Sequence, residues 1–299
     1  MNVYYSDHIT FPLPAGHRFP AAKYALLRQE LLQQNILQER ELIPATHIAP
    51  EIVTLAHTQA YFNSILDGSI DDRSMRQIGI PWSPELVRRS LSSVGGSLQA
   101  AQDALRQGIA GNLGGGTHHA MADQGRGFCV FNDLAIVSLY WLQNQIVRKI
   151  AIIDLDVHQG DGNAALLVKN PHVFTFSMHG AKNYPFHRVP STLDIDLPDG
   201  TQDQEYLAAL ENALPRVLAF RPEIIFYLAG VDPLAEDRLG RLQLSMQGLA
   251  QRDYLVLNAC RSNQIPVAIV MGGGYAQPIE HTAWAHAQTY RVAKEIYPI

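Results

Sequence analysis

The sequence has few cysteines, little net charge and no long apolar run. Its two cysteines, Cys129 and Cys260, cannot form a disulfide framework and are interpreted as reduced core residues. A formal net charge of -5 provides no broad basic surface, so direct nucleic-acid binding is not expected. The N-terminus lacks the basic and apolar segments of a signal peptide, and no apolar run is long enough to span a bilayer. We therefore expect a cytoplasmic protein with no membrane contact.

Two common motifs of catalysis and nucleotide binding are also missing. No serine or cysteine lies in a Gly-x-Ser-x-Gly context, which disfavours covalent catalysis. The glycines at 114–116 lack both the Gly-Lys-Ser/Thr ending of a P-loop and the spacing of a dinucleotide fingerprint. Phosphate binding by these glycines is therefore not expected.

Strand and helix patterns alternate along most of the 299 residues. The composition, 47% hydrophobic and 17% charged, suits a globular enzyme with a sizeable core. Alternating strands and helices predict right-handed crossovers and a mostly parallel sheet between two helical layers, an α/β fold with three layers, α/β/α. Because repeats and linkers are absent from the sequence, we expect residues 1–299 to form a single domain.

Apolar runs rich in β-branched residues predict the strands, and amphipathic segments predict the helices. The expected strands are 3–5, 109–113, 149–157, 173–178, 193–197, 223–230 and 266–271. The expected helices are 21–38, 52–66, 84–106, 131–145, 161–168, 203–220, 249–263 and 279–296. Ser83 and Pro84 are typical of a helix start, whereas residues 68–81 are predicted to form a surface loop.

Side chains suited to catalysis follow four of these expected strands. In an open parallel sheet, ligands bind beyond the carboxyl ends of the strands, so these groups should meet in one crevice. Each alone has an ordinary explanation, as solvent-facing histidines, an Asp-Pro turn or a glycine-rich loop. Their joint occurrence at strand ends predicts a site. The groups are His118, His119, Asp154, Asp156, His158, Asp161, Asp232 and Tyr275.

Three of these side chains have the donor types of a mononuclear metal site. Asp156, His158 and Asp232 supply two carboxylates and one imidazole, and such a site keeps an open position for water or substrate. Zinc suits these donors, and Fe(II) is an alternative.

The remaining groups suggest proton transfer and carbonyl polarisation. His118 and His119 are imidazoles that can take a proton near pH 7 and return it. Asp154 and Asp161 can orient those imidazoles, and the Tyr275 hydroxyl can hold a developing oxyanion. Together with a metal, these groups predict hydrolysis of an amide. The other histidines are interpreted as surface or capping residues: His8, His17, His47, His57, His172, His179, His187, His281 and His286.

Five stretches resemble the zinc-dependent histone deacetylase family of the arginase–deacetylase superfamily. In this order and spacing they are highly specific, and they cover most of the chain from about residue 80. The compact length and residues 197–201 are more similar to bacterial and class IV members. The stretches are Gly114 to Ala120, Gly127 to Asp133, Asp154 to Gly162, Ala229 to Asp232, and Gly272 to Tyr275.

The resemblance implies the arginase–deacetylase fold and a role for each matching residue. It implies that Asp156, His158 and Asp232 bind zinc. It implies that His119, paired with Asp161, is the general base and acid, and that His118, paired with Asp154, is its electrostatic partner. Tyr275 is implied as the group that polarises the carbonyl. It also implies an acyl-lysine tunnel with Gly127 and Phe128 on one wall, Tyr184 opposite, Gly273 beside the substrate and Leu239 near the mouth. A structural K⁺ or Na⁺ is implied beside Asp154, with Ser177 contributing a hydroxyl.

The chain departs from the family in ways that bear on its substrate. The loop at 67–82 has no clear match to the acid that grips the substrate backbone at the rim, for which Asp71 or Asp72 is a candidate. Leu239 replaces the glutamate of polyamine-preferring relatives, and Leu234 stands where arginases have a second-metal ligand. The expected function is therefore removal of acetyl or other acyl groups from lysine in proteins or peptides. The alternatives are an amidohydrolase for small N-acetylated amines and a non-catalytic metal-dependent binding protein. The oligomeric state is left open.

Overall fold

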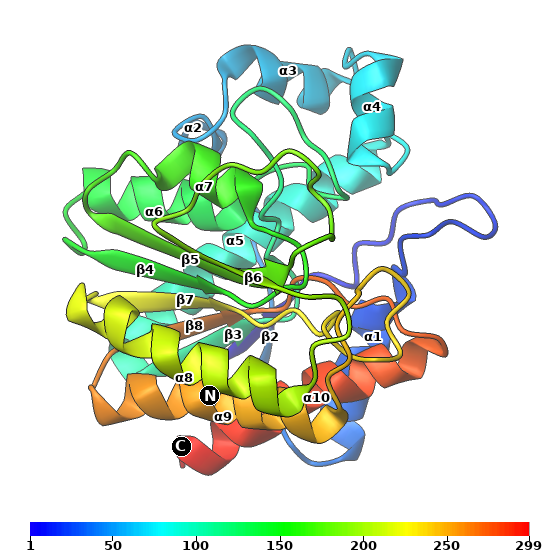
Figure 1. Cartoon of the computed structure of the whole chain (residues 1–299). Helices are drawn as coiled ribbons and strands as arrows, with labels where there is room; N and C mark the ends of the chain where they lie inside the picture. The colour runs from blue at the N-terminus through cyan, green and yellow to red at the C-terminus, as the bar shows by residue number, and fades with distance from the viewer. Residues whose placement is uncertain (299) are drawn as a thin grey trace.

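Eight parallel strands form one sheet in the order β2-β1-β3-β8-β7-β4-β5-β6, in a computed structural model that describes residues 1–298 (Figure 1). Every strand pairing within these residues is parallel. The strands are β1 (Val3–Tyr5), β2 (Leu42–Pro44), β3 (Ile109–Asn112), β4 (Ile150–Asp154), β5 (Val173–Gly180), β6 (Leu193–Leu197), β7 (Ile224–Leu228) and β8 (Val267–Val270).

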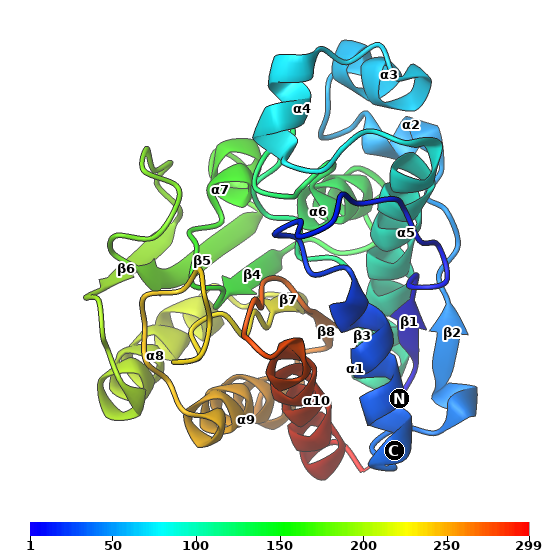
Figure 2. The same cartoon turned by 90° about the vertical axis from the view of Figure 1, so that its right-hand side faces the viewer.

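Helices cover both faces of this sheet, which confirms the expected three-layer α/β/α fold (Figures 1 and 2). One face carries α5 (Pro84–Gln107), α6 (Asp133–Gln143) and α7 (Asp161–Leu167), and the other carries α1 (Ala22–Gln33), α8 (Asp203–Ala219), α9 (Met246–Ser262) and α10 (Ile279–Ile296). Three short helices lie outside α5 and α6: α2 (Pro50–Val53), α3 (Gln59–Asp67) and α4 (Asp72–Ile78). A 3₁₀ turn (Glu39–Glu41) precedes β2.

The sheet separates two hydrophobic cores, which explains the continuous apolar runs of its central strands. In β4, Ala151 and Ile153 pack into one core and Ile150 and Ile152 into the other. Alternate side chains of a strand point to opposite faces, so a strand covered on both faces is apolar throughout. Cys129 and Cys260 are both buried and unpaired, as expected. No helix within residues 1–298 is long and apolar enough to cross a bilayer.

Three local predictions were wrong, each in the first 80 residues. Residues 68–81 are not a loop throughout, because α4 forms there, capped by Asp71 and ended by Gly79 in the left-handed conformation. The helix expected at 52–66 is two helices, and the second begins where Thr58 accepts a hydrogen bond from Tyr61 N. The edge strand β2 was missed because it has three residues and ends at a proline.

Helix α5 begins as expected and packs closely against the chain before it. Ser83 Oγ accepts a hydrogen bond from Leu86 N at 3.0 Å, and Pro84 is the first helical residue. Gly95 marks a close contact, because a Cβ there would lie 1.8 Å from the carbonyl oxygen of Thr46. The close approach holds the N-terminal segment against the helix that covers β3 and β8.

Candidate active site

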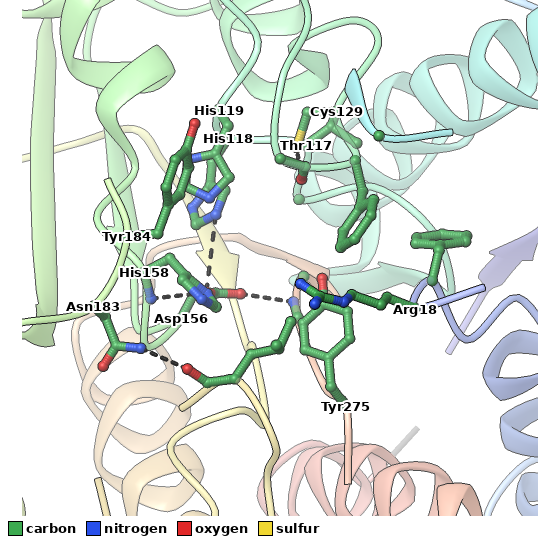
Figure 3. Close-up of a pocket in the computed structure, with 18 of the residues that line it drawn as sticks. Arg18, Thr117, His118, His119, Cys129, Asp156, His158, Asn183, Tyr184 and Tyr275 are labelled. Carbon is green, nitrogen blue, oxygen red and sulfur yellow. Dashed lines mark hydrogen bonds and ion pairs between the residues drawn. The ribbon is translucent and has the colours of Figure 1, made fainter. Parts of the chain in front are cut away.

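The four strands that precede the predicted groups are neighbours in the sheet. Their order is β3-β8-β7-β4, in the middle of the eight strands. His118 and His119 follow β3, Asp156 and His158 follow β4, and the loops after β7 and β8 carry the remaining groups, Asp232 and Tyr275. The sheet therefore brings side chains that are distant in the sequence to one pocket at its carboxyl edge, where Asp232 is fully buried against the lining residue His158 (Figure 3).

Asp156, His158 and Asp232 form a buried cluster that could hold a metal ion. One ligand atom from each lies within 4.8 Å of the others. His158 Nδ1 is 2.9 Å from Asp156 Oδ1 and 3.1 Å from Asp232 Oδ2. Backbone N–H groups fix the other carboxylate oxygens: Gly273 N donates to Asp156 Oδ2 at 2.6 Å, and Val157 N donates to Asp232 Oδ1 at 2.8 Å.

The charges in this cluster favour a bound cation. Burial and the neighbouring Asp156 raise the pKa of Asp232 to about 7. Burial also opposes ionisation of Asp156, but His118 and His158 hold its pKa well below the usual range. A divalent ion would relieve this repulsion and release the protons, so the donor set fits zinc or Fe(II). Gly273 permits the close packing, because a Cβ there would lie 2.0 Å from Asp232 Oδ2.

Two histidine–aspartate pairs lie beside the cluster. His118 Nδ1 is 2.8 Å from Asp154 Oδ2, and His119 Nδ1 is 2.7 Å from Asp161 Oδ1. The two imidazole rings are 4.1 Å apart between centroids, and both residues line the pocket. Because each Nδ1 atom is held by a carboxylate, each Nε2 atom remains available to bind or exchange a proton.

The two imidazoles differ in protonation. Burial, followed by the charge of His118, lowers the pKa of His119 to about 4. Burial also disfavours the charged form of His118, but Asp154 and Asp156 outweigh it and raise its pKa to about 9. Without a metal ion, His119 is therefore neutral at pH 7 and His118 is protonated.

Aromatic rings flank the path to the cluster. Phe128 and Tyr275 have ring centroids 6.0 Å apart, and the Tyr184 ring meets the His119 ring edge-on at 4.9 Å. Burial, reinforced by Asp156 and Asp232, raises the pKa of Tyr275 well above its ordinary value, so its hydroxyl stays a donor. The pocket is also lined by the other expected tunnel residues, Gly127, Leu239 and Gly273.

The residues expected at a monovalent cation lie behind this pocket. Asp154 and Ser177 are register partners on β4 and β5, and both are buried. Ser177 Oγ is 2.9 Å from His179 Nδ1 and accepts a hydrogen bond from Gly160 N at 3.4 Å. The two side chains are brought together, and the ion stays a prediction.

Neither candidate for the rim acid lines the pocket. Asp71 caps α4, where its Oδ1 atom accepts from Arg73 N at 2.9 Å and Ser74 N at 3.0 Å. Asp72 is exposed in the first turn of the same helix. Their carboxylates thus serve or flank a helix start and do not face the site.

Two cationic residues at the site were not predicted from the sequence. The buried Lys23 donates from Nζ to the carbonyl oxygen of Gly272 at 3.0 Å, and its ammonium is 5.2 Å from the centroid of the Tyr275 ring. Arg126 pairs with Asp161 and donates from Nε to the carbonyl oxygen of His119 at 3.3 Å. Lys23 lies on the same helical face as Leu27, four residues later, a pattern that signals a buried lysine. No such signal exists for Arg126.

Three of the nine remaining histidines are buried, which corrects their interpretation as surface or capping residues. His57 donates from Nδ1 to the carbonyl oxygen of Met121 at 2.8 Å and accepts from Asn132 N at 2.9 Å. His179 lies beside Ser177, and His286 lies behind the loop that carries Tyr275. The other six are exposed or partly exposed.

Comparison with known proteins agrees with this geometry. The model of the histone deacetylase domain matches residues 17–291. An uncharacterized protein of Picosynechococcus is 41% identical over 99% of this chain and 98% of its own. "Histone deacetylase 2" of Arabidopsis thaliana is 31% identical over 87% of this chain and 70% of its own. The crystal structure of a histone deacetylase homolog in complex with SAHA superposes with a TM-score of 0.82, at 25% identity, over 99% of this chain and 84% of that one.

Proposed function

Because the chain belongs to the histone deacetylase family, we propose that it is a zinc-dependent hydrolase that removes acetyl or other acyl groups from lysine side chains of proteins or peptides. One observation carries this proposal. The Asp156–His158–Asp232 cluster, two His–Asp pairs and Tyr275 belong to one pocket region, which is more machinery than a binding protein needs. A zinc ion held by the cluster would polarise the amide carbonyl and make the attacking water more acidic.

We assign the proton transfers to His119. Its neutral ring can take the proton of the attacking water on Nε2 and return it to the departing amine. Asp161, 2.7 Å from Nδ1, keeps the ring in the tautomer and orientation that this requires. His118, whose Nδ1 atom is 2.8 Å from Asp154 Oδ2, would be its electrostatic partner beside the reacting carbonyl.

Tyr275 would donate its hydroxyl proton in a hydrogen bond to the oxygen on which charge develops. Its raised pKa keeps that proton in place, and Asp237 fixes the backbone by accepting from Tyr275 N at 2.6 Å. Asp154 and Ser177, behind His118, would hold a structural K⁺ or Na⁺.

The aromatic walls suit a lysine side chain. Phe128 and Tyr184 line the pocket, and their rings would bury the methylene groups of the acylated lysine and exclude water from the reacting amide. Gly127 leaves room for the His119 ring, because a Cβ there would lie 2.6 Å from His119 Cδ2.

Release of acetate from an acetyl-lysine peptide tests the proposal. Activity should disappear after chelation and return with added zinc, while Asp156→Ala protein should stay inactive and bind no zinc. Equal activity after full removal of the metal would refute the zinc dependence. Loss of peptide activity with retained hydrolysis of a small N-acetylated amine would identify the amidohydrolase instead. Fe(II) loading in the same assay compares the two metals.

A further inference from the structure

The mouth of the pocket carries positive charge on an otherwise acidic protein. Arg18, in the loop before α1, extends into the pocket, as Figure 3 shows. Lys182, after β5, and Arg241, beyond β7, also line the pocket with exposed side chains. Three separate segments thus place a cation at the mouth, although the chain has a formal net charge of -5.

These cations are only partly neutralised by the protein itself. Asp199 is shared between two of them, with its Oδ2 atom 3.3 Å from Arg241 Nη1 and 3.8 Å from Lys182 Nζ. Arg18 makes no ion pair within the part of the chain that the structure describes. A positive surplus therefore faces whatever enters the pocket.

No acid offsets this surplus inside the pocket. Among the described residues that line it, Asp156 is the only carboxylate, and it belongs to the metal cluster on the floor. Beside the mouth, Phe186 is 81% exposed and meets the Tyr184 ring edge-on, which adds an apolar contact for a docked chain.

We propose that the mouth binds an acidic segment of the substrate, with Asp or Glu residues flanking the acylated lysine. The proposal rests on the deacylase function proposed above and names its substrate class. Carboxylates of such a segment would pair with Arg18 and Arg241, while a polycation such as an acylated polyamine or a lysine-rich tail would be repelled. Electrostatic attraction in a cleft lined by one sign of charge raises the rate of productive encounter.

The test uses three acetyl-lysine peptides of equal length, with aspartate, serine or lysine at the four flanking positions. For the zinc-loaded full chain, we expect kcat/KM to be about tenfold or more higher for the acidic peptide than for the basic one at low ionic strength. The ratio should shrink at high ionic strength, because salt screens these charges.

Charge reversal locates the effect. The Arg18→Glu/Arg241→Glu protein should lose the preference or invert it, mainly through KM. Arg216→Glu/Arg261→Glu is the matched control, because it also reverses two exposed arginines, in the last turns of α8 and α9 near the amino ends of the strands, and should keep the wild-type ratio. Thermal unfolding shows that each variant is folded.

The outcomes separate this inference from the proposed function. Equal kcat/KM values for the three peptides, or a preference for the basic one, would overturn the acidic substrate class and leave the deacylase intact. No turnover of any peptide by zinc-loaded protein would instead contradict the deacylase itself. A preference that survives the double charge reversal would also refute the assignment to Arg18 and Arg241.

Discussion

At the scale of single residues, one extra contact distinguishes the two adjacent histidines. His118 lies near the carboxylates of both Asp154 and Asp156, whereas His119 faces Asp161 alone. Arg126 also pairs with Asp161 and so takes up part of its negative charge. In the metal-free protein the charged form is therefore stabilised on His118 and not on His119. The proposed mechanism accordingly assigns charge stabilisation to His118 and proton transfer to His119.

His119→Ala tests this division. Removal of the base should lower kcat by a factor of about 10² to 10⁴. Zinc content, measured by metal analysis, should stay unchanged, because His119 is not in the Asp156–His158–Asp232 cluster. His172→Ala is a control that removes an exposed histidine just before β5, at the amino end of the strand and away from the pocket. Wild-type turnover by the His119→Ala protein would contradict the acid–base role.

Tyr275→Phe isolates the hydroxyl group. Its loss should reduce kcat by about 10² to 10³, since one donor to the developing oxyanion is removed while the ring still packs against Phe128. Steady-state kinetics and metal analysis should show a fall in kcat with full zinc occupancy. A variant that turns over like wild type would take Tyr275 out of the mechanism.

At the scale of elements, His57 joins the short outer helices to the loop that carries His118 and His119. It lies between α2 and α3, and it binds Met121 in that loop and Asn132, the residue that caps α6. Nδ1 donates and Nε2 accepts, so this link requires a neutral ring. Burial lowers the pKa of His57 to about 4, and the hydrogen bond to Met121 opposes this shift only in part.

Acid should weaken this link. The unfolded chain binds a proton at His57 near pH 6.5 and the folded one only near pH 4, so stability is full above pH 6.5 and falls as the pH drops between these values. Urea unfolding should show a contribution of up to about 1.4 kcal/mol per pH unit in this window. His57→Asn keeps a donor and removes the titration, so its stability should fall less steeply. Equal slopes would contradict the assignment.

The elements that could be predicted from sequence are those with a continuous apolar run or with clear capping residues. β4 and β7 were recognised from buried apolar runs and α5 from its capping residues. Helix α4 was not predicted because its residues are mostly polar and its ends are set by a capping residue, Asp71, and a terminal glycine, Gly79. Contacts between distant exposed segments, such as the approach of Arg18 to the pocket, leave no local pattern and required the structure.

At the scale of the whole molecule, the parallel direction of the strands explains why the site residues could be predicted before the strand order was known. Parallel strands put their carboxyl ends on one edge, so any residue just beyond a strand was a candidate. No local sequence pattern indicates that four of the strands are adjacent, and only the structure shows the order β3-β8-β7-β4. The positive charge of the mouth could not be predicted for a related reason, because its three cations come from segments that meet only in the folded chain.

Metal binding should stabilise the folded chain as a whole. A ligand that binds only the folded state adds about 2.7 kcal/mol at a hundredfold excess over its Kd. Calorimetry should show a higher Tm with zinc for the wild type and no shift for Asp156→Ala. Asp232 and His118 bind protons more tightly in the folded metal-free protein than in the unfolded chain, because their pKa values are raised. This contribution to stability is present at low pH and is lost as the pH rises toward 9. Because zinc must displace these protons, the increase in Tm with zinc should be larger at pH 8 than at pH 6. A smaller effect at pH 8 would contradict this coupling.

The position of β8 also sets the order in which the protein matures. β8 is the last strand of the chain, yet it lies between β3 and β7, and the loop after it carries Tyr275 and the backbone N–H that holds Asp156. On the ribosome, the nascent chain can pair its earlier strands but leaves a gap in the middle of the sheet. The candidate site is therefore complete only once β8 and the loop after it have formed, and we expect a chain truncated before β8 to be inactive because it lacks Tyr275 and the contact that holds Asp156.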